Sequence, residues 1–99
     1  MVEKRQPNAF CGTDLNDRLM AHGHLDLIVC GFMTHSSVSS TVRAAKDYGF
    51  RCTLVDAAIA TRDIPLGDGT LAAADLHRME MAALADNFAV VVPKARDVL

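Results

Sequence analysis

Three short hydrophobic runs divide the chain into segments of alternating character. They occupy residues 27–30, 52–55 and 89–92, and they are rich in β-branched side chains with hardly a polar residue among them. Continuous runs of this length are typical of strands that are buried on both faces, as in parallel sheets. The pattern therefore predicts three buried strands.

Helical periodicity separates the first two runs. Val38, Val42 and Ala45 fall on one face of a helix over residues 37–48. Gly49 follows at the position where a left-handed residue commonly ends a helix. We therefore expect a helix that packs this apolar face against the sheet.

Two further helices are expected on the same grounds. Leu76 and Met79 mark the apolar stripe of a helix over residues 71–87, between the second and third runs. A helix over residues 14–22 precedes the first run, with Thr13 as its candidate cap. The order of helices and strands predicts two consecutive right-handed βαβ units and hence a parallel sheet.

The predicted fold is α/β, a three-layer Rossmann-like parallel sheet, here a partial one of about three strands with flanking helices. Residues 1–99 are expected to form a single partial domain, with residues 63–70 as its only sizeable irregular loop. Because no strand precedes the first helix, we expect the chain to correspond to the second half of a doubly wound domain. Open sheet edges favour pairing, so it should self-associate or bind a complementing N-terminal half.

Composition excludes several classes of partner. The chain has 99 residues, of which 51% are hydrophobic and 22% charged, and its net charge is −2. This is a globular composition without the basic excess that binding to nucleic acid or to an anionic membrane needs. No apolar run approaches the ~20 residues of a membrane span. Residues 1–7 lack the apolar core of a secretory signal.

The cysteines and histidines do not form a metal-binding pattern. Cys11, Cys30 and Cys52 are an odd set without CxxC spacing, and the last two are expected to be buried strand residues. His22 and His24 flank a helix end, where a cation is favourable. We therefore expect no metal, no cofactor and a reducing, cytoplasmic environment.

The candidate site is the turn after the first predicted strand. Ligands of open parallel sheets gather at the carboxyl ends of strands, next to helix N-termini. That strand ends at Cys30 and Gly31, and residues 32–38 lead directly into a helix. A nucleophile at the start of this helix would lie at the positive end of the helix dipole, and free backbone N–H groups there could stabilise an oxyanion.

An ordered set of motifs runs through this turn and beyond it. Residues 30–45 read CGFMTHSSVSSTVRAA, in which Gly-x-x-Thr is followed by Ser-Val and by Thr-x-Arg-x-Ala. Residues 56–63 add Asp-Ala and Ala-Thr-Arg-Asp, and residues 4–15 add a lysine followed by Asn-Ala-Phe and Gly-Thr-Asp-Leu. Apart from the serine of Ser-Val, where the family has cysteine, the series resembles the isochorismatase-like cysteine hydrolases over almost the whole chain. Because that family includes nicotinamidases, other amidohydrolases and isochorismatases, the resemblance implies hydrolysis of an amide or related bond in a small molecule.

The resemblance also implies roles for individual residues. Hydrolases of this family use an Asp–Lys–Cys triad, in which cysteine attacks a carbonyl, aspartate moves its proton and lysine stabilises the pair. The lysine corresponds to Lys4 and the nucleophile to Ser37. The oxyanion hole would be the backbone N–H groups of Met33 and Ser37, shaped by a cis peptide bond between Phe32 and Met33. Phe32 and His35 are candidate substrate contacts, the alternative for His35 being an exposed loop histidine without a ligand.

Two departures from the family pattern lower the expected activity. The triad aspartate would lie at the end of an earlier strand, and no residue of this sequence corresponds to it. A thiol with a pKa of ~8.5 needs only a modest shift to become a thiolate. The Ser37 hydroxyl, by contrast, must lose its proton to a positioned base during attack. The chain by itself is therefore expected to be a weak or inactive catalyst.

The local sequence leaves other interpretations open. Ser37 lies among Ser36, Ser39 and Ser40, where serines commonly cap helices, and an engineered change of cysteine to serine would leave the same sequence. Lys4 could be a solvated terminal lysine. The whole chain could be a non-catalytic pseudoenzyme that binds or assembles, or a fragment without a function of its own.

Overall fold

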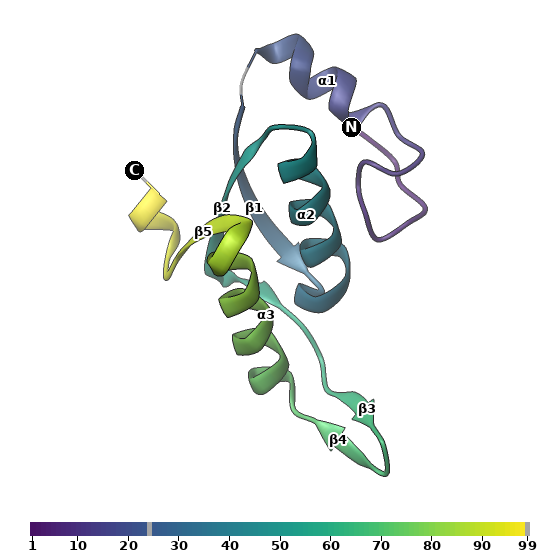
Figure 1. Ribbon diagram of the computed structural model, residues 1–99, viewed down its shortest axis with the longest axis vertical. Helices are drawn as coiled ribbons and strands as arrows, with labels where there is room; N and C mark the ends of the chain where they lie inside the picture. The colour runs from purple at the N-terminus through teal and green to yellow at the C-terminus, as the bar shows by residue number, and fades with distance from the viewer. Residues whose placement is uncertain (24, 99) are drawn as a thin grey trace.

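The central sheet consists of three parallel strands, which are β1 (Asp26–Phe32), β2 (Arg51–Ala60) and β5 (Ala89–Val92). Their order is β1-β2-β5, with β2 in the middle (Figure 1). The computed structural model describes residues 1–23 and 25–98, so His24 lies outside the described residues. Each strand contains one of the hydrophobic runs, and the predicted α/β fold with a parallel sheet and flanking helices is confirmed.

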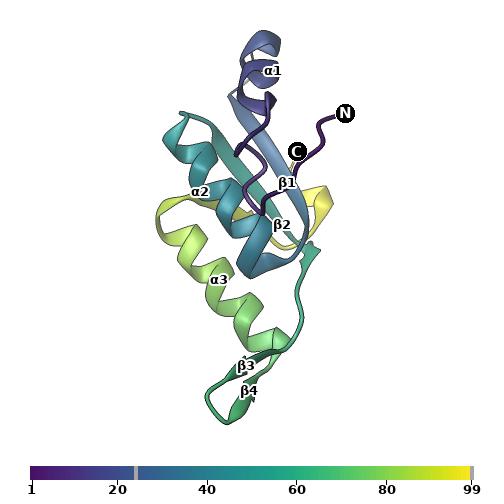
Figure 2. The ribbon, with the colours of Figure 1, turned by 90° about the vertical axis from the view of Figure 1, so that its right-hand side faces the viewer.

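Two helices pack on the same face of this sheet (Figure 2). α2 (Ser39–Asp47) follows β1, and α3 (Ala73–Asn87) precedes β5. Gly49 has a φ of 92°, the left-handed backbone that ends a helix, as predicted for α2. The start of the predicted helix is different, because its first two residues belong to a π-helical turn, η1 (Thr34–Val38), and α2 begins at Ser39.

The hydrophobic core lies between the sheet and these two helices. Leu54 of β2, Val42 of α2 and Leu84 of α3 are all 0% exposed. Within the sheet, Leu54 is paired with Val29 of β1 and Val91 of β5, and both pack against the same core. The middle strand therefore supplies the centre of the core.

α3 buries a different stripe from the predicted one. Met79 is 54% exposed, whereas Leu76 and Met81 are 8% and 4% exposed. The assignment of Met79 to the buried stripe is therefore wrong. Helical periodicity allows two neighbouring stripes, and the positions of β2 and α2 decide which of them is buried.

The face of the sheet opposite α2 and α3 exposes apolar side chains. Ile28 and Phe32 of β1 are 63% and 76% exposed, and Val90 of β5 is 62% exposed. Cys30 is also exposed. The prediction that all strands are buried on both faces, with Cys30 inside, is therefore wrong for the outer strands, because both helices pack on the other face.

Residues 63–70 do not form the irregular loop that the sequence predicts. They lie in an antiparallel hairpin of β3 (Ile64–Leu66) and β4 (Gly69–Leu71), with Gly67 at a φ of 60° between the strands. The hairpin projects beyond the carboxyl end of β2 (Figure 1). Strands of three residues, one of them with Pro65 at its centre, are too short for a two-residue alternation to reveal.

The hairpin also determines where α3 begins. Leu71 pairs with Ile64, so the helix starts at Ala73 and not at residue 71 as predicted. The Asp63 carboxylate accepts a hydrogen bond from the Ala73 N–H at 2.7 Å. This carboxylate satisfies one of the N–H groups that a helix start leaves unpaired, and it suits the positive end of the dipole.

The N-terminal segment packs against α2 and the start of β2. The Phe10 ring is 5% exposed, and its centroid lies 5.0 Å from that of Tyr48 and 6.0 Å from that of Phe50. The Ala9 N–H donates a hydrogen bond to Thr41 Oγ1 at 2.9 Å. These contacts hold the segment that precedes them, which carries Lys4, next to the first turns of α2.

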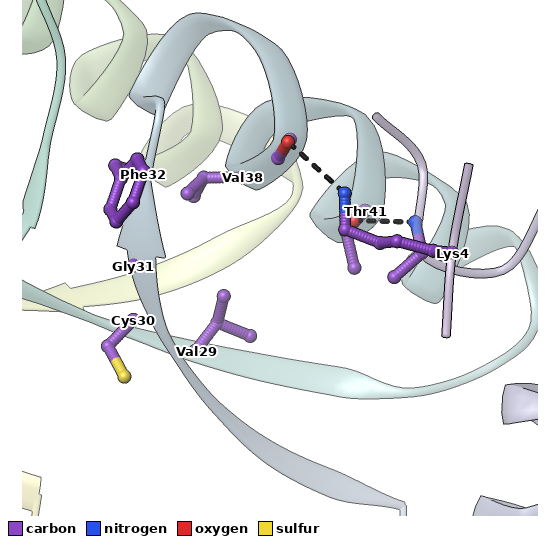
Figure 3. A pocket seen from close by; sticks show the side chains of 9 residues that line it. Lys4, Val29, Cys30, Gly31, Phe32, Val38 and Thr41 are labelled. Carbon is purple, nitrogen blue, oxygen red and sulfur yellow. Dashed lines mark hydrogen bonds between the residues drawn. The ribbon is translucent and has the colours of Figure 1, made fainter. Parts of the chain in front are cut away.

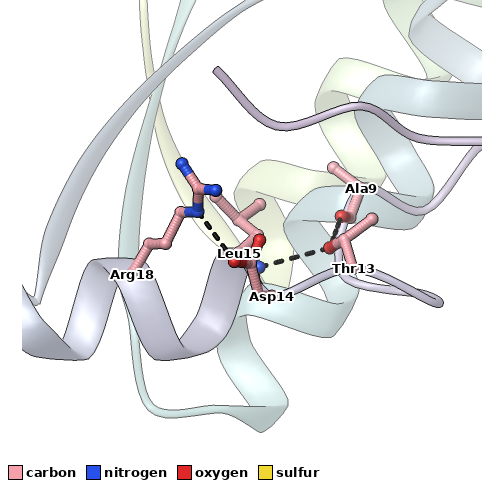
Figure 4. Close-up of polar contacts among 5 residues, drawn as sticks. All are labelled: Ala9, Thr13, Asp14, Leu15 and Arg18. Atoms are coloured by element: carbon pink, nitrogen blue, oxygen red, sulfur yellow. Dashed lines mark hydrogen bonds and ion pairs between the residues drawn. The ribbon is translucent and has the colours of Figure 1, made fainter.

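Hydrogen bonds also define the entry into α1 (Leu15–His22) (Figure 4). The Thr13 hydroxyl donates to the Ala9 carbonyl at 2.6 Å and accepts from the Leu15 N–H at 3.3 Å. The N-cap residue is Asp14 and not Thr13 as predicted, although the Thr13 hydroxyl contacts the first N–H of the helix. Arg18 Nε donates to the Asp14 carboxylate at 2.9 Å, and this hydrogen bond lowers the pKa of Asp14.

Candidate active site

β1 runs into α2 through a tight turn at the carboxyl end of the sheet. The peptide bond between Phe32 and Met33 is cis, as the family resemblance implies. The Met33 carbonyl then accepts hydrogen bonds from the Ser36 and Val38 N–H groups at 3.1 and 3.2 Å. This turn contains Ser37, which lies two residues before Ser39, the first residue of α2.

Lys4 and Ser37, the two residues predicted to be catalytic, are in contact. Lys4 Nζ donates to Ser37 Oγ at 3.4 Å (Figure 3). The same ammonium donates to the carbonyl oxygens of Gln6 and Pro7 at 3.1 and 3.4 Å. Three acceptors thus hold an otherwise exposed lysine against a residue 33 positions away in the sequence.

A cavity of about 300 Å³ lies beside this pair (Figure 3). The N-terminal segment, β1 and the start of α2 contribute its lining, which consists of Lys4, Ala9, Val29, Cys30, Gly31, Phe32, Ser37, Val38 and Thr41. None of these described lining residues carries a carboxylate. Lys4 therefore supplies the formal charge of the lining. The uncharged polar side-chain groups of the lining are two hydroxyls and one thiol.

The other predicted site residues differ in their relation to the cavity. Phe32 lines the cavity and is largely exposed. Met33 is half-buried and lies at the cis bond. His35 is absent from the described lining, and its Nδ1 is 2.7 Å from Thr61 Oγ1, which ties it to the segment after β2.

A histidine that sequence patterns do not single out lies behind the turn. His77 of α3 is hydrogen bonded through Nδ1 to Thr34 Oγ1 at 2.7 Å and through Nε2 to Asp56 Oδ1 at 2.8 Å. These partners are 43 and 21 positions away. No local pattern links residues at such separations, and the only sequence signal was a polar residue beside the buried stripe of α3.

The thiols of the chain have different environments. Cys11, Cys30 and Cys52 are free, and Cys52 alone of the three is buried. Burial raises the pKa of the Cys52 thiol, so this thiol is a poor nucleophile. In the described part of the chain, no group of three or more His, Cys, Asp or Glu could hold a metal ion. No helix there is long and apolar enough to cross a membrane.

The fold is a Rossmann-like α/β sheet, and the turn that leads from β1 toward α2 carries Ser37 in contact with Lys4. The isochorismatase domain family matches residues 1–96. The chain therefore belongs to the isochorismatase family, which confirms the resemblance seen in its motifs.

Solved structures share this fold over nearly the whole chain. An isochorismatase from Pseudomonas putida KT2440 is 63% identical, with a TM-score of 0.92 over 96% of this chain and 49% of that one. A cysteine hydrolase from Pseudomonas syringae pv. phaseolicola 1448A is 30% identical, with a TM-score of 0.91 over 98% of this chain and 46% of that one.

Curated relatives give the same result. The uncharacterized isochorismatase family protein YddQ of Bacillus subtilis (strain 168) is 38% identical over 91 residues, which are 92% of this chain and 51% of the relative. This chain thus spans about half the length of that relative.

Proposed function

We propose that this chain carries the nucleophile position and the lysine of an isochorismatase-family hydrolase that cleaves an amide or related bond in a small molecule. Ser37 takes the nucleophile position, and Lys4 stabilises it electrostatically. The backbone N–H groups of Met33 and Ser37 form the oxyanion hole, and Phe32 contacts the substrate. The observation that carries the proposal is the 3.4 Å contact between Lys4 Nζ and Ser37 Oγ at the start of α2.

The same geometry supports low activity for the chain alone. A serine hydroxyl needs a positioned base to become a nucleophile. No carboxylate is among the described residues that line the cavity, and the acceptors of Lys4 described above are two carbonyl oxygens and one hydroxyl. The helix dipole contributes about 0.3–1 kcal/mol at a surface site, which is too little to ionise serine. We therefore propose weak or no turnover unless another polypeptide, such as a complementing N-terminal half, supplies a carboxylate.

The change Ser37→Cys tests the nucleophile position. In chains that also carry Cys11→Ser and Cys30→Ser, this variant is expected to release p-nitrophenolate from p-nitrophenyl acetate in a stoichiometric burst. It should retain the acetyl group as a thioester at position 37. The burst should be roughly 100-fold or more faster than in the matched chain with Ser37, because a thiolate forms without a base. Stopped-flow absorbance and mass spectrometry of the labelled peptide measure the rate and the site.

A pair of lysine variants provides the control for this experiment. Lys4→Met removes the cation beside position 37 and is expected to slow the acylation of the Ser37→Cys chain. Lys94→Met changes an exposed lysine that follows β5, at the other edge of the sheet, and should leave the rate unchanged. Equal effects of the two lysine variants, or acetylation mainly elsewhere than position 37, would contradict the proposed site.

We also propose that the chain self-associates through β1 and the exposed face beside it. Within the described residues, β1 is paired on one side only, with β2. Ile28 and Phe32 of β1 expose apolar surface beside this edge, and Val90 of β5 exposes more on the same face of the sheet. Both the unpaired edge and the apolar face favour association. Light scattering is expected to give at least twice the 10.7 kDa mass of one chain.

Two equally exposed residues give a matched control for self-association. Ile28→Lys should shift the chain toward monomer, because Ile28, at 63% exposure, lies on the proposed interface. Leu66→Lys should not, because Leu66, at 64% exposure, lies in the β3–β4 hairpin. A folded monomer of the unaltered chain, or equal behaviour of the two variants, would contradict this part of the proposal.

A non-catalytic binding or assembly role is the alternative function. Serine at the nucleophile position and the absence of a carboxylate from the described lining of the cavity favour it. The acylation experiment separates the two, because a binding protein has no need for a reactive group at position 37. For either function, three free cysteines support a reducing, cytoplasmic location as part of the proposal.

A further inference from the structure

His77 joins three elements behind the candidate site. It projects from α3, and its ring nitrogens bond to Thr34 of η1 at 2.7 Å and to Asp56 of β2 at 2.8 Å. The His77 side chain is 19% exposed and that of Asp56 is 48% exposed, while Thr34 is 0% exposed. The chain of hydrogen bonds therefore runs from a partly solvated carboxylate to a fully buried hydroxyl.

Chemistry determines which groups donate and which accept in these two hydrogen bonds. An ionised Asp56 can only accept, so His77 Nε2 carries the proton and donates it to the carboxylate. In a neutral imidazole the other nitrogen is then an acceptor, so the Thr34 hydroxyl donates to Nδ1. Thr34 thus has its buried hydroxyl satisfied by a residue whose own orientation Asp56 fixes.

Thr34 in turn closes the turn that holds Ser37. Its backbone carbonyl accepts a hydrogen bond from the Ser39 N–H, across the π-helical turn. The His77 bond fixes the side chain of Thr34, and the Ser39 bond fixes its main chain. Ser37 lies between Thr34 and Ser39 in the sequence, so its position relative to Lys4 depends on both of these residues.

The order Asp–His–hydroxyl is the same as in a hydrolase triad, but burial excludes that role here. A nucleophile must reach its substrate, and Thr34 is fully buried. His77 is also absent from the described lining of the cavity. The arrangement can act on the site only through the turn.

We propose that His77 is a positioning residue that clamps the π-helical turn in the conformation that presents Ser37 to Lys4. His77 acts on the turn through its hydrogen bond to Thr34, and Asp56 orients the His77 ring. The effect of the clamp on Ser37 as a nucleophile position rests on the proposed function. The clamp itself is a property of the turn, and it can be measured without any activity.

Amide hydrogen exchange of the full chain tests the clamp directly. His77→Phe keeps an aromatic ring but removes both hydrogen bonds, and it is expected to speed exchange of residues 34–39 about 5- to 100-fold, because the Thr34 hydroxyl loses its partner. His77→Gln offers a carboxamide oxygen to Thr34 and an N–H to Asp56, and it should restore most of the protection. Unchanged exchange of residues 34–39 in a folded His77→Phe chain, or no rescue by glutamine, would overturn the proposal.

Asp56→Ala provides a second route if His77→Phe prevents folding. Its half-exposed position should tolerate the change, and exchange of residues 34–39 should rise by a smaller factor than in His77→Phe. Protection equal to that of the unaltered chain would count against the clamp.

Thiol titration links the clamp to the site. In the Ser37→Cys chain that lacks Cys11 and Cys30, iodoacetamide labelling as a function of pH reports the thiol pKa at position 37. His77→Phe is expected to move this pKa upward, toward ~8.5, because the thiol moves away from Lys4 and the helix start. His77→Gln should move it back. If Lys4→Met leaves that pKa unchanged while exchange still responds to His77, the proposed function fails and the clamp stands.

Discussion

Replacing Phe10 by alanine is expected to lower the free energy of unfolding by about 3–5 kcal/mol. The ring is 5% exposed and lies within 5.0 and 6.0 Å of the Tyr48 and Phe50 rings, centroid to centroid. Its removal deletes apolar contacts and leaves a cavity that these neighbours fill only in part. Urea denaturation followed by circular dichroism measures the loss.

The same change should also release Lys4 from Ser37. Phe10 and the Ala9–Thr41 hydrogen bond attach the N-terminal segment to α2. In the Ser37→Cys chain, Phe10→Ala is therefore expected to slow acylation at position 37 under conditions where the protein is still folded. Adding Lys4→Met to the Phe10→Ala chain should slow acylation little further, because both changes remove the same cation from the site.

Phe32→Ala is the matched control for the stability effect. It truncates the same side chain at 76% exposure, and the expected change in a monomer is within about 0.5 kcal/mol. Similar losses for both phenylalanines would contradict the assignment of Phe10 to the core.

Leu54→Ala is expected to cost about 2–5 kcal/mol of unfolding free energy. Leu54 is 0% exposed at the middle of the central strand, and its neighbours come from both outer strands and both long helices. A chain of this size has about 5–15 kcal/mol of total stability. The variant should therefore unfold at a markedly lower urea concentration.

Val90→Ala serves as the control for Leu54. Val90 also lies in the sheet, but it is 62% exposed on the face opposite the helices, so its truncation should change stability by no more than about 0.5 kcal/mol in a monomer. If both changes cost the same, the core would not be one-sided as the structure shows. A larger loss for Val90 in an associated form would instead indicate burial of that face between chains.

The candidate site was partly predictable because its motif is continuous. Gly31, Thr34 and Ser37 follow one another at the end of a hydrophobic run, so the strand-to-helix turn and the place of Ser37 in it can be assigned locally. The cis bond between Phe32 and Met33 came from the family resemblance and is present. The contact of Lys4 with Ser37 also came from that resemblance, since nothing local relates residues 33 positions apart.

The amino-acid sequence by itself determined the elements with a clear repeat, namely the parallel strands and the buried face of α2 with Val42 and Ala45. It could not determine which faces of β1 and β5 are exposed, or that Met81 and not Met79 is buried. Periodicity describes one segment at a time, whereas burial depends on which segments pack against it.

Only the tertiary structure decided the surroundings of the site. Asp56, His77 and Thr34 belong to three different elements, and their hydrogen bonds exist because the sheet order and the packing of α3 bring those elements together. A hydrogen bond depends on distance and direction between particular atoms, and such geometry has no period along the chain. For that reason the sequence indicated where Ser37 lies, and the folded protein showed which side chains lie behind the turn that carries it.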